Sequence, residues 1–210
     1  MKSIFLYALT VIVVGLGVTL AIVVSENEPY SAEKFFLSDW ALTPDNHLAV
    51  ASRDLQKTAY AASVHEIQRA INQMKSIEYL TDTEGINLVE ESINHLVSVE
   101  EEIKAGKGDP DHLEEASIEC LNTLALIHLK LSEDLSKEGN PKKAMRSIRI
   151  AIKHLQNAID MAHLGSQRVG ERIVIGELNV LLDSLEENGH LNERDYTISA
   201  NDLVRLIKND

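Results

Sequence analysis

The chain has 210 residues and a net charge of −13 at pH 7, because 33 Asp and Glu residues outweigh 20 Lys and Arg residues. This acidic balance argues against a surface that binds nucleic acid or anionic lipid headgroups. The single cysteine, Cys120, excludes an internal disulfide bond. Few aromatic residues and only four prolines favour an all-α fold.

The N-terminal segment contains an apolar run, residues 4–24, without a charged side chain. A helix rises about 1.5 Å per residue, so this run spans about 30 Å, the thickness of a bilayer core. The alternative is a cleaved signal peptide that ends after Ser25. Its apolar centre is usually shorter, about 7–15 residues. The length therefore favours an uncleaved transmembrane anchor over residues 1–25.

The charges beside the run predict its orientation. Lys2 precedes the run, and Glu26 and Glu28 follow it. Because basic residues favour the cytoplasmic side, the N-terminus is expected in the cytoplasm and the domain in the periplasm or outside the cell. A cleaved signal peptide would place the domain on the same side.

A pair of small residues inside the run, Gly17 and Ala21, predicts a possible transmembrane packing face. Small residues four positions apart let two membrane helices approach closely. This spacing makes a homodimer possible.

Residues 26–42 form a connector that carries three aromatic residues, Phe35, Phe36 and Trp40. These side chains either lie at the membrane interface or cover one end of a helical bundle. We favour the second interpretation because they lie well beyond the end of the apolar run. The bundle itself is expected over residues 43–210.

A first long helix is predicted from Thr43 toward Leu80. Thr43 followed by Pro44 is typical of a helix start. Apolar residues then recur at spacings of three and four, as on one face of a helix. The segment before Ser52 is also compatible with a separate helix. The apolar positions on this face are Tyr60, Val64, Ile67, Ile71, Met74 and Ile77.

A second helix is predicted after Thr81, which forms a capping box with Glu84. Glu100 interrupts the apolar pattern, so the end of this helix is expected to fray or face water. Gly106 and Gly108 end it. The apolar positions on its inner face are Ile86, Val89, Ile93, Leu96 and Ile103.

A third and a fourth helix are predicted to start at Asp109-Pro110 and Asn140-Pro141. The segment 121–131 is apolar on more than one face, so the third helix is expected at the centre of the domain. Gly139 ends it. The fourth helix carries a stripe of small and apolar residues that permits close packing: Ala144, Ile148, Ala151, Leu155, Ala158 and Ala162.

Two shorter helices are predicted at the C-terminal end. One follows Gly165-Ser166 and ends at Asn188-Gly189, with Val174, Leu178, Leu181 and Leu185 facing the core. The other is expected to begin at a cap over residues 199–202. Its apolar residues are Leu203 and Ile207.

An internal similarity relates the predicted helices. Residues 91–96 align with residues 150–155, and the same offset places Thr81 over Asn140. Helices one and two therefore resemble helices three and four. Short loops make consecutive helices antiparallel, so the sequence predicts an up-and-down bundle of two similar α-hairpins plus one or two C-terminal helices.

Eight histidines raise the question of a metal or cofactor. Di-iron bundles use Glu-x-x-His motifs, but Ser92 precedes His95 by three and Ala151 precedes His154 by three. The sequence lacks the Cys-x-x-Cys-His motif of covalent haem. We therefore predict neither metal nor cofactor. His128, in the most apolar segment, leaves a non-covalent haem or small-ligand site as the alternative.

A basic stripe is predicted on the fourth helix, where four cations share one face at spacings of four, three and four. One interpretation is a docking surface for an acidic protein. The other, which we favour from sequence, is a solvated face that pairs with Glu90 and Glu91 of the companion hairpin. The four residues are Lys142, Arg146, Arg149 and Lys153.

The sequence contains no recognisable catalytic triad, phosphate-binding loop or paired-carboxylate motif. We therefore predict a non-enzymatic protein-interaction or scaffold module, anchored in the cell membrane through residues 4–24. Its partners are the membrane and another protein, with no nucleic acid. The alternative is an extracytoplasmic bundle that binds a small ligand, a metal or haem.

Overall fold

The residues that the structure describes form a short 3-10 helix and seven α-helices, most of which begin or end at the residues that the sequence marks. A computed structural model describes residues 39–77, 81–162 and 168–208, all within the unit of residues 35–210. These residues form no β-strand, which confirms the all-α prediction. The elements are η1 (Asp39–Leu42), α4 (Thr43–Gln56), α5 (Tyr60–Lys75), α6 (Thr83–Lys104), α7 (Pro110–Lys137), α8 (Pro141–Met161), α9 (Val169–Asn188) and α10 (Glu193–Lys208).

The predicted anchor, residues 1–25 with Gly17 and Ala21, lies outside the described residues. The same holds for the side chains of Phe35, Phe36 and Trp40. Among the helices that the structure describes, none is long and apolar enough to cross a membrane.

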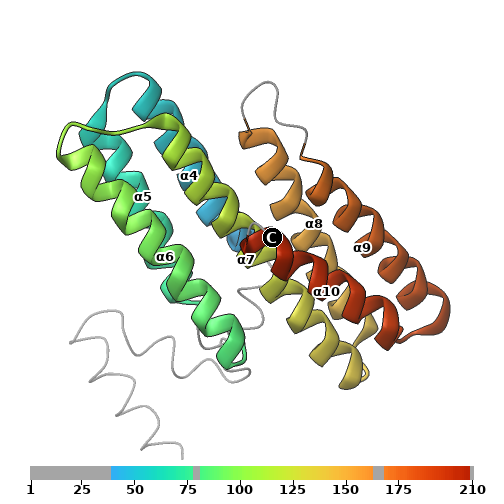
Figure 1. Ribbon diagram of the computed structural model, residues 1–210. Coiled ribbons are helices and arrows are strands. Elements are labelled where there is room, and N and C mark those ends of the chain that lie inside the picture. Colours follow the sequence, from blue (N-terminus) through green and yellow to red (C-terminus); the bar gives the residue numbers. More distant parts are fainter. Residues whose placement is uncertain (1–38, 78–80, 163–167, 209–210) are drawn as a thin grey trace, which may run out of the picture. The chain divides into compact units, whose positions relative to one another are not determined.

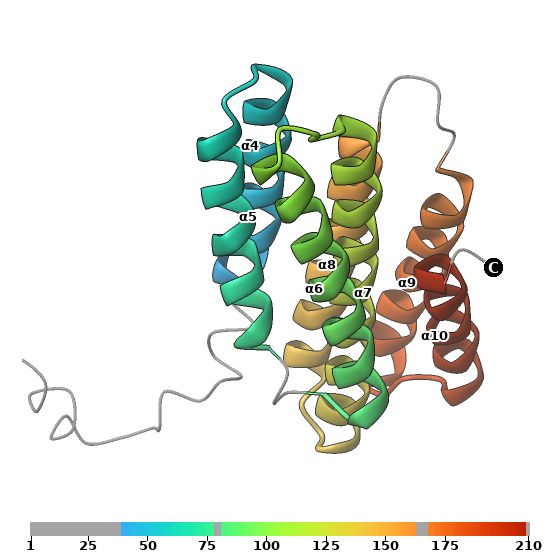
Figure 2. The ribbon, with the colours of Figure 1, turned by 60° about the vertical axis from the view of Figure 1, so that its left-hand side comes forward.

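Helix α7 belongs to two groups of four helices. In the first group, α4 packs on α5, α5 on α6, α6 on α7 and α7 on α4. In the second, α7 packs on α8, α8 on α9, α9 on α10 and α10 on α7. Figures 1 and 2 show α4 to α6 on one side of α7, with α9 and α10 on the other.

The burial of α7 explains how it serves both groups. Every residue from Leu121 to Leu129 is buried, including the polar Asn122, Thr123 and His128. A helix that is covered on all sides needs apolar residues on all sides. The predicted central position of this helix is therefore confirmed.

The prediction of one helix from Thr43 toward Leu80 is wrong, and the alternative of a separate first helix is confirmed, although the break lies after Gln56 and not before Ser52. Helix α4 ends at Gln56, and α5 begins at Tyr60 after a tight turn in which Thr58 adopts a left-handed backbone (φ 59°). No glycine or proline marks this turn in the sequence. As a result, α4 folds back on α5 and completes the first group of four helices. The predicted four-helix core instead used the fourth predicted helix, α8, at this position.

The interrupted apolar pattern predicts that the helix frays or faces water at Glu100, and this prediction is wrong. Its side chain is buried, and Gln68 Nε2 on α5 donates a hydrogen bond of 2.7 Å to Glu100 Oε1. The carboxylate also pairs with Lys104, one turn further along α6. Hydrogen-bonded partners make a buried carboxylate tolerable, so α6 stays regular through this position.

Two predicted helix starts are shifted. Asp82, and not Thr81, caps α6, because its Oδ1 accepts a hydrogen bond of 2.8 Å from the Gly85 N–H. Helix α10 begins at Glu193 instead of residues 199–202. Ser199 lies buried within that helix, where its hydroxyl donates to the backbone carbonyl of Asp195.

Candidate functional site

The predicted basic stripe lies on the outer face of α8. All four side chains, Lys142, Arg146, Arg149 and Lys153, are exposed. The opposite face of α8 supplies buried residues to the core that α7, α8, α9 and α10 share. We call these four residues the α8 stripe.

The ion pairs that we favoured from sequence for the α8 stripe are not formed. Glu90 and Glu91 are exposed on α6. Helices α6 and α8 both pack extensively against α7 and not against each other. Within the described part of the chain, no acidic side chain forms an ion pair with a stripe residue. The four charges therefore face solvent.

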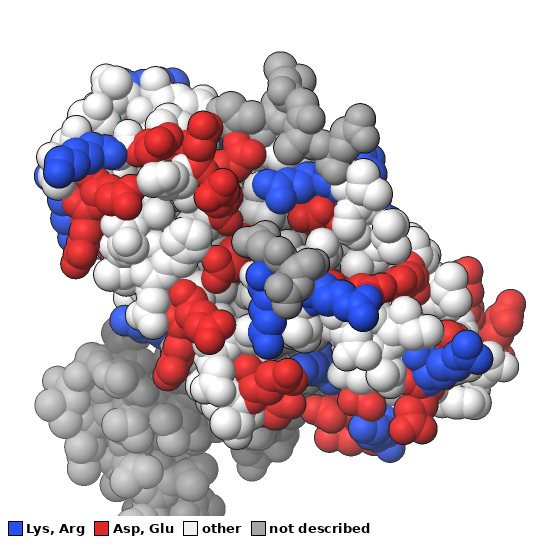
Figure 3. All heavy atoms as spheres, in the orientation of Figure 1, with Lys and Arg blue, Asp and Glu red and all other residues white. Residues whose placement is uncertain are grey.

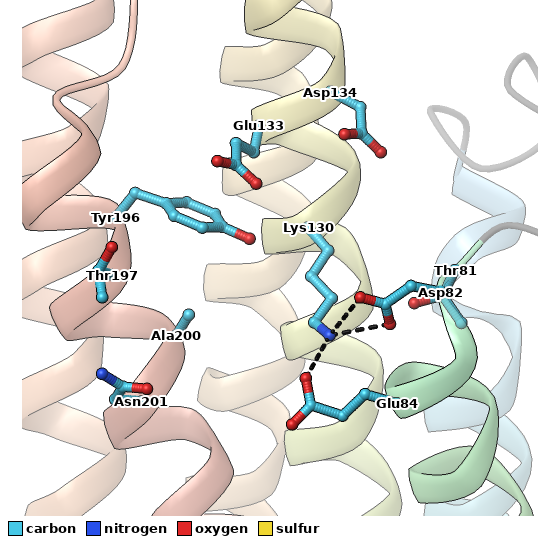
Figure 4. A pocket seen from close by; sticks show the side chains of 10 residues that line it. All are labelled: Thr81, Asp82, Glu84, Lys130, Glu133, Asp134, Tyr196, Thr197, Ala200 and Asn201. Atoms are coloured by element: carbon cyan, nitrogen blue, oxygen red, sulfur yellow. Dashed lines mark hydrogen bonds and ion pairs between the residues drawn. The ribbon is translucent and has the colours of Figure 1, made fainter.

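A second polar feature, which the sequence analysis missed, is an open cleft of about 610 Å³ between the start of α6, the end of α7 and α10. Figure 4 shows Lys130 at its centre, with its amine directed at Asp82 and Glu84. Lys130 Nζ lies 2.9 Å from Asp82 Oδ1 and 2.8 Å from Glu84 Oε2. Tyr196 extends from α10 toward Glu133 across the cleft.

Lys130 is paired with Asp82 and Glu84, and all three residues line this cleft. Burial alone would lower the pKa of Lys130, but its hydrogen bonds to Glu84 and Asp82 raise that pKa. Burial would likewise raise the pKa of Asp82, but the Gly85 N–H and Lys130 lower it. Burial and the nearby Glu133 raise the pKa of the Tyr196 phenol. Lys130 thus fixes the start of α6 against α7.

The other charged residues that line the cleft, Glu133 and Asp134, are acidic, like much of the surface around it. Figure 3 shows acidic side chains spread over the face that carries α6 and α10, with basic ones between them. In the described residues, no three His, Cys, Asp or Glu side chains are grouped so that they could hold a metal ion. The geometry of this cleft therefore supports a structural role for Lys130.

Replacing Lys130 with methionine is expected to lower the free energy of unfolding by about 1 kcal/mol or less, because both carboxylate partners are largely exposed. Urea denaturation of the full chain measures the change. The loss should shrink at high salt, since screening weakens the pair in the parent protein. Lys137→Met removes the ion pair that a more exposed lysine forms with Glu133, and it provides the control. An equal loss at low and high salt would contradict the ion-pair explanation.

Two buried histidines form a polar centre where α4, α7 and α8 meet. The rings of His128 and His154 lie 5.3 Å apart. His154 Nδ1 lies 2.9 Å from both carboxylate oxygens of Asp45, and Asn157 Nδ2 donates to Asp45 Oδ2 at 2.6 Å. The Ser147 hydroxyl donates to the His128 carbonyl at 2.7 Å. This network joins α4 to α8 across the side of α7.

His128 gives the small-ligand alternative no geometric support. Its side chain is 1% exposed. Burial, together with the neighbouring His154, holds the pKa of His128 well below its usual value, so its ring is neutral at pH 7. Three clefts of the described residues are lined by side chains other than His128. Cys120 is also buried, and burial raises the pKa of its thiol.

No protein-family model, curated protein or solved structure matches this chain. Of the predicted site residues, the α8 stripe lies on a described surface, whereas Gly17 and Ala21 lie outside the described residues and stay a prediction.

Proposed function

We propose that the chain is a non-enzymatic interaction module, tethered to the cell membrane by residues 4–24, which docks an acidic protein through the α8 stripe. The domain lies outside the cytoplasm in this proposal. The apolar run and the position of Lys2 before it support the tether and its orientation. The exposure of four aligned cations carries the docking function.

The α8 stripe is basic, whereas the chain as a whole is strongly acidic. A chain with a net charge of −13 repels acidic proteins at long range. Four exposed cations along three turns of α8 create a local region of opposite sign. Such a patch orients an acidic partner and raises its association rate. Ion pairs on an exposed surface contribute little to the stability of the fold, so this stripe suits binding better than folding.

The double change Arg146→Glu and Arg149→Glu tests the proposal. Capture of the partner by crosslinking in the native membrane should fall by about tenfold or more, because like charges across an interface cost several kcal/mol. The fold should survive, since exposed substitutions usually change stability by less than about 0.5 kcal/mol. Mass spectrometry of the crosslinked products measures the capture, and thermal denaturation measures the fold.

Lys107→Glu with Arg194→Glu is the matched control, because it reverses two exposed charges elsewhere and changes the net charge equally. Capture should persist in this control. Raising the salt concentration should also weaken capture by the parent protein, since the Debye length is only about 8 Å at physiological ionic strength. Capture that is unchanged by both the stripe reversal and high salt would refute the docking function.

A further inference from the structure

Helices α4 and α8 meet at a buried polar network, and they have few other contacts. Asp45 of α4 accepts hydrogen bonds from His154 Nδ1 and from the amide of Asn157, both on α8. Asp45 and His154 are buried. The packing of α4 against α5 is far more extensive than its packing against α7 or α8. The contact of α4 with α8 therefore depends mainly on two side chains whose charges change with pH.

A second buried imidazole lies beside this network. The rings of His128 on α7 and His154 on α8 lie 5.3 Å apart, with an angle of 30° between their planes. His128 Nδ1 lies 3.3 Å from the Ser147 hydroxyl, which itself donates to the His128 carbonyl. Both rings are buried, and His154 is the one that bonds to Asp45. We call His128 and His154 the histidine pair.

The hydrogen bonds of the histidine pair leave little room for a further proton. A carboxylate only accepts, so His154 Nδ1 carries a proton and donates it to Asp45. In the described part of the chain, His154 Nε2 is buried and has no hydrogen-bond partner. A proton on Nε2 would be a buried donor without an acceptor, which costs free energy. A proton on His128 would place a cation directly beside the His154 ring.

The pKa of His128 gives the direction of the effect. Burial first, and then the neighbouring His154, lower this pKa well below its ordinary value. A histidine in solvent takes up a proton below about pH 6.5. The closed state therefore binds fewer protons than an open state in which water reaches the ring. Its stability is present above about pH 6.5 and falls as the pH drops below that value.

The charged groups that other helices bring to this end of α7 are directed elsewhere. From α6, Asp82 and Glu84 pair with Lys130. From α10, Tyr196 extends toward Glu133 (Figure 4). The titratable groups that α4 and α8 supply therefore decide how the histidine pair responds to acid.

We infer that the histidine pair makes the contact of α4 with α7 and α8 sensitive to acid: below about pH 6.5, α4 moves away from these helices, and the two rings meet water and take up protons. The inference concerns the fold and holds whether or not the α8 stripe docks a partner. Helix α4 is the first α-helix after the predicted connector, residues 26–42. The contact thus opens at the part of the domain that follows the predicted anchor in the chain.

Acid acts in the opposite direction on the contact between α4 and α5. His47 Nδ1 of α4 lies 2.6 Å from Glu66 Oε2 of α5. Burial would raise the pKa of Glu66, but the hydrogen bond and the charge of His47 lower it. Protonation of His47 therefore strengthens this pair as long as Glu66 stays ionised. The opening is expected between α4 and α8, and not between α4 and α5.

Hydrogen exchange of the full chain at about pH 7 and about pH 5 measures the opening. Protection factors are compared, because they remove the intrinsic pH dependence of exchange. The protection of α4 should fall by about tenfold or more at the lower pH, the change expected when one histidine takes up its proton only in the open state. The protection of α9, in the second group, should stay the same.

Two variants assign the effect to the histidine pair. His128→Leu removes one titratable ring and keeps the backbone carbonyl to which Ser147 donates. In this variant the fall in α4 protection should shrink to about twofold or less. His190→Gln removes an exposed histidine between α9 and α10, so it is the matched control and should keep the full response. An equal response in the parent protein and in His128→Leu overturns the inference.

Nuclear magnetic resonance of ¹³C-labelled histidine in the full-length protein gives a second measurement that needs no variant. The His128 ring should keep the signal of neutral imidazole down to about pH 5 for as long as α4 is protected. A His128 ring that titrates near pH 6.5 while α4 stays protected overturns the inference, because the closed contact then tolerates the proton. Loss of protection in all helices together also overturns it, since the whole domain then unfolds in acid.

Discussion

Replacing Asp45 with alanine is expected to lower the free energy of unfolding by about 3–5 kcal/mol, the usual loss when one member of a buried ionisable pair is removed. Asp45 is 3% exposed, and its partner His154 is fully buried. The substitution would leave His154 Nδ1 and the amide of Asn157 without their acceptor. A buried donor without an acceptor loses its hydration without compensation.

The position of this pair makes the effect large. Asp45 lies on α4 in the first helical group, and His154 lies on α8 in the second. Helices α4 and α8 have few other contacts. The pair is therefore a main direct connection between the two groups apart from α7 itself.

Urea denaturation followed by circular dichroism measures the loss. Asp45→Asn keeps an acceptor oxygen and the shape of the side chain, so it should cost less than Asp45→Ala. Asp183→Ala, at an exposed position of α9, provides the control and should change stability by less than about 0.5 kcal/mol. A loss below about 1 kcal/mol for Asp45→Ala would show that this buried pair contributes no more than a surface pair.

Local features of the helices could be predicted from the sequence. Threonine or asparagine before proline correctly marks the starts of α4 and α8, and Gly139 and Gly189 follow the ends of α7 and α9 with left-handed backbones. Such signals act within one turn of a helix, so they do not depend on the rest of the fold.

Features that depend on contacts between distant segments were missed. The turn at Thr58 contains no residue that demands a left-handed backbone, so the sequence does not mark where α4 and α5 separate. Glu100 is buried because Gln68 of α5 reaches it. Asp45 and His154 are 109 positions apart in the chain, and their contact follows only from how α4 and α8 pack on α7.

The surface was predicted in part. Helical periodicity alone places the α8 stripe on one face, and the structure shows that this face is exposed. The exposed apolar residues on the outer side of α9 were missed, because the inner apolar stripe was enough to predict the helix. Periodicity does not tell an exposed face from a buried one, whereas the structure shows that Ile173 and Val180 are exposed.

Replacing Leu129 with alanine is expected to cost about 2–5 kcal/mol of stability, the range for a leucine removed from a packed core. Leu129 is fully buried on α7 and belongs to the cluster that α7 forms with α8, α9 and α10. On the side of α7 toward α6, Thr123 bonds to Ser92 at 2.9 Å. Because both groups need α7, the loss should weaken α5 and α6 as well as α9 and α10.

Hydrogen exchange of the full chain tests this coupling, since it reports the opening of each helix. In Leu129→Ala, the slowest amides of α6 and of α9 should lose protection by similar factors, because α7 cannot leave one group and remain in the other. Leu182→Ala, at a half-buried position of α9, provides the control with a smaller loss. Protection that falls in α9 but is unchanged in α6 would show that the two groups unfold independently, and that α7 is held by the first group alone.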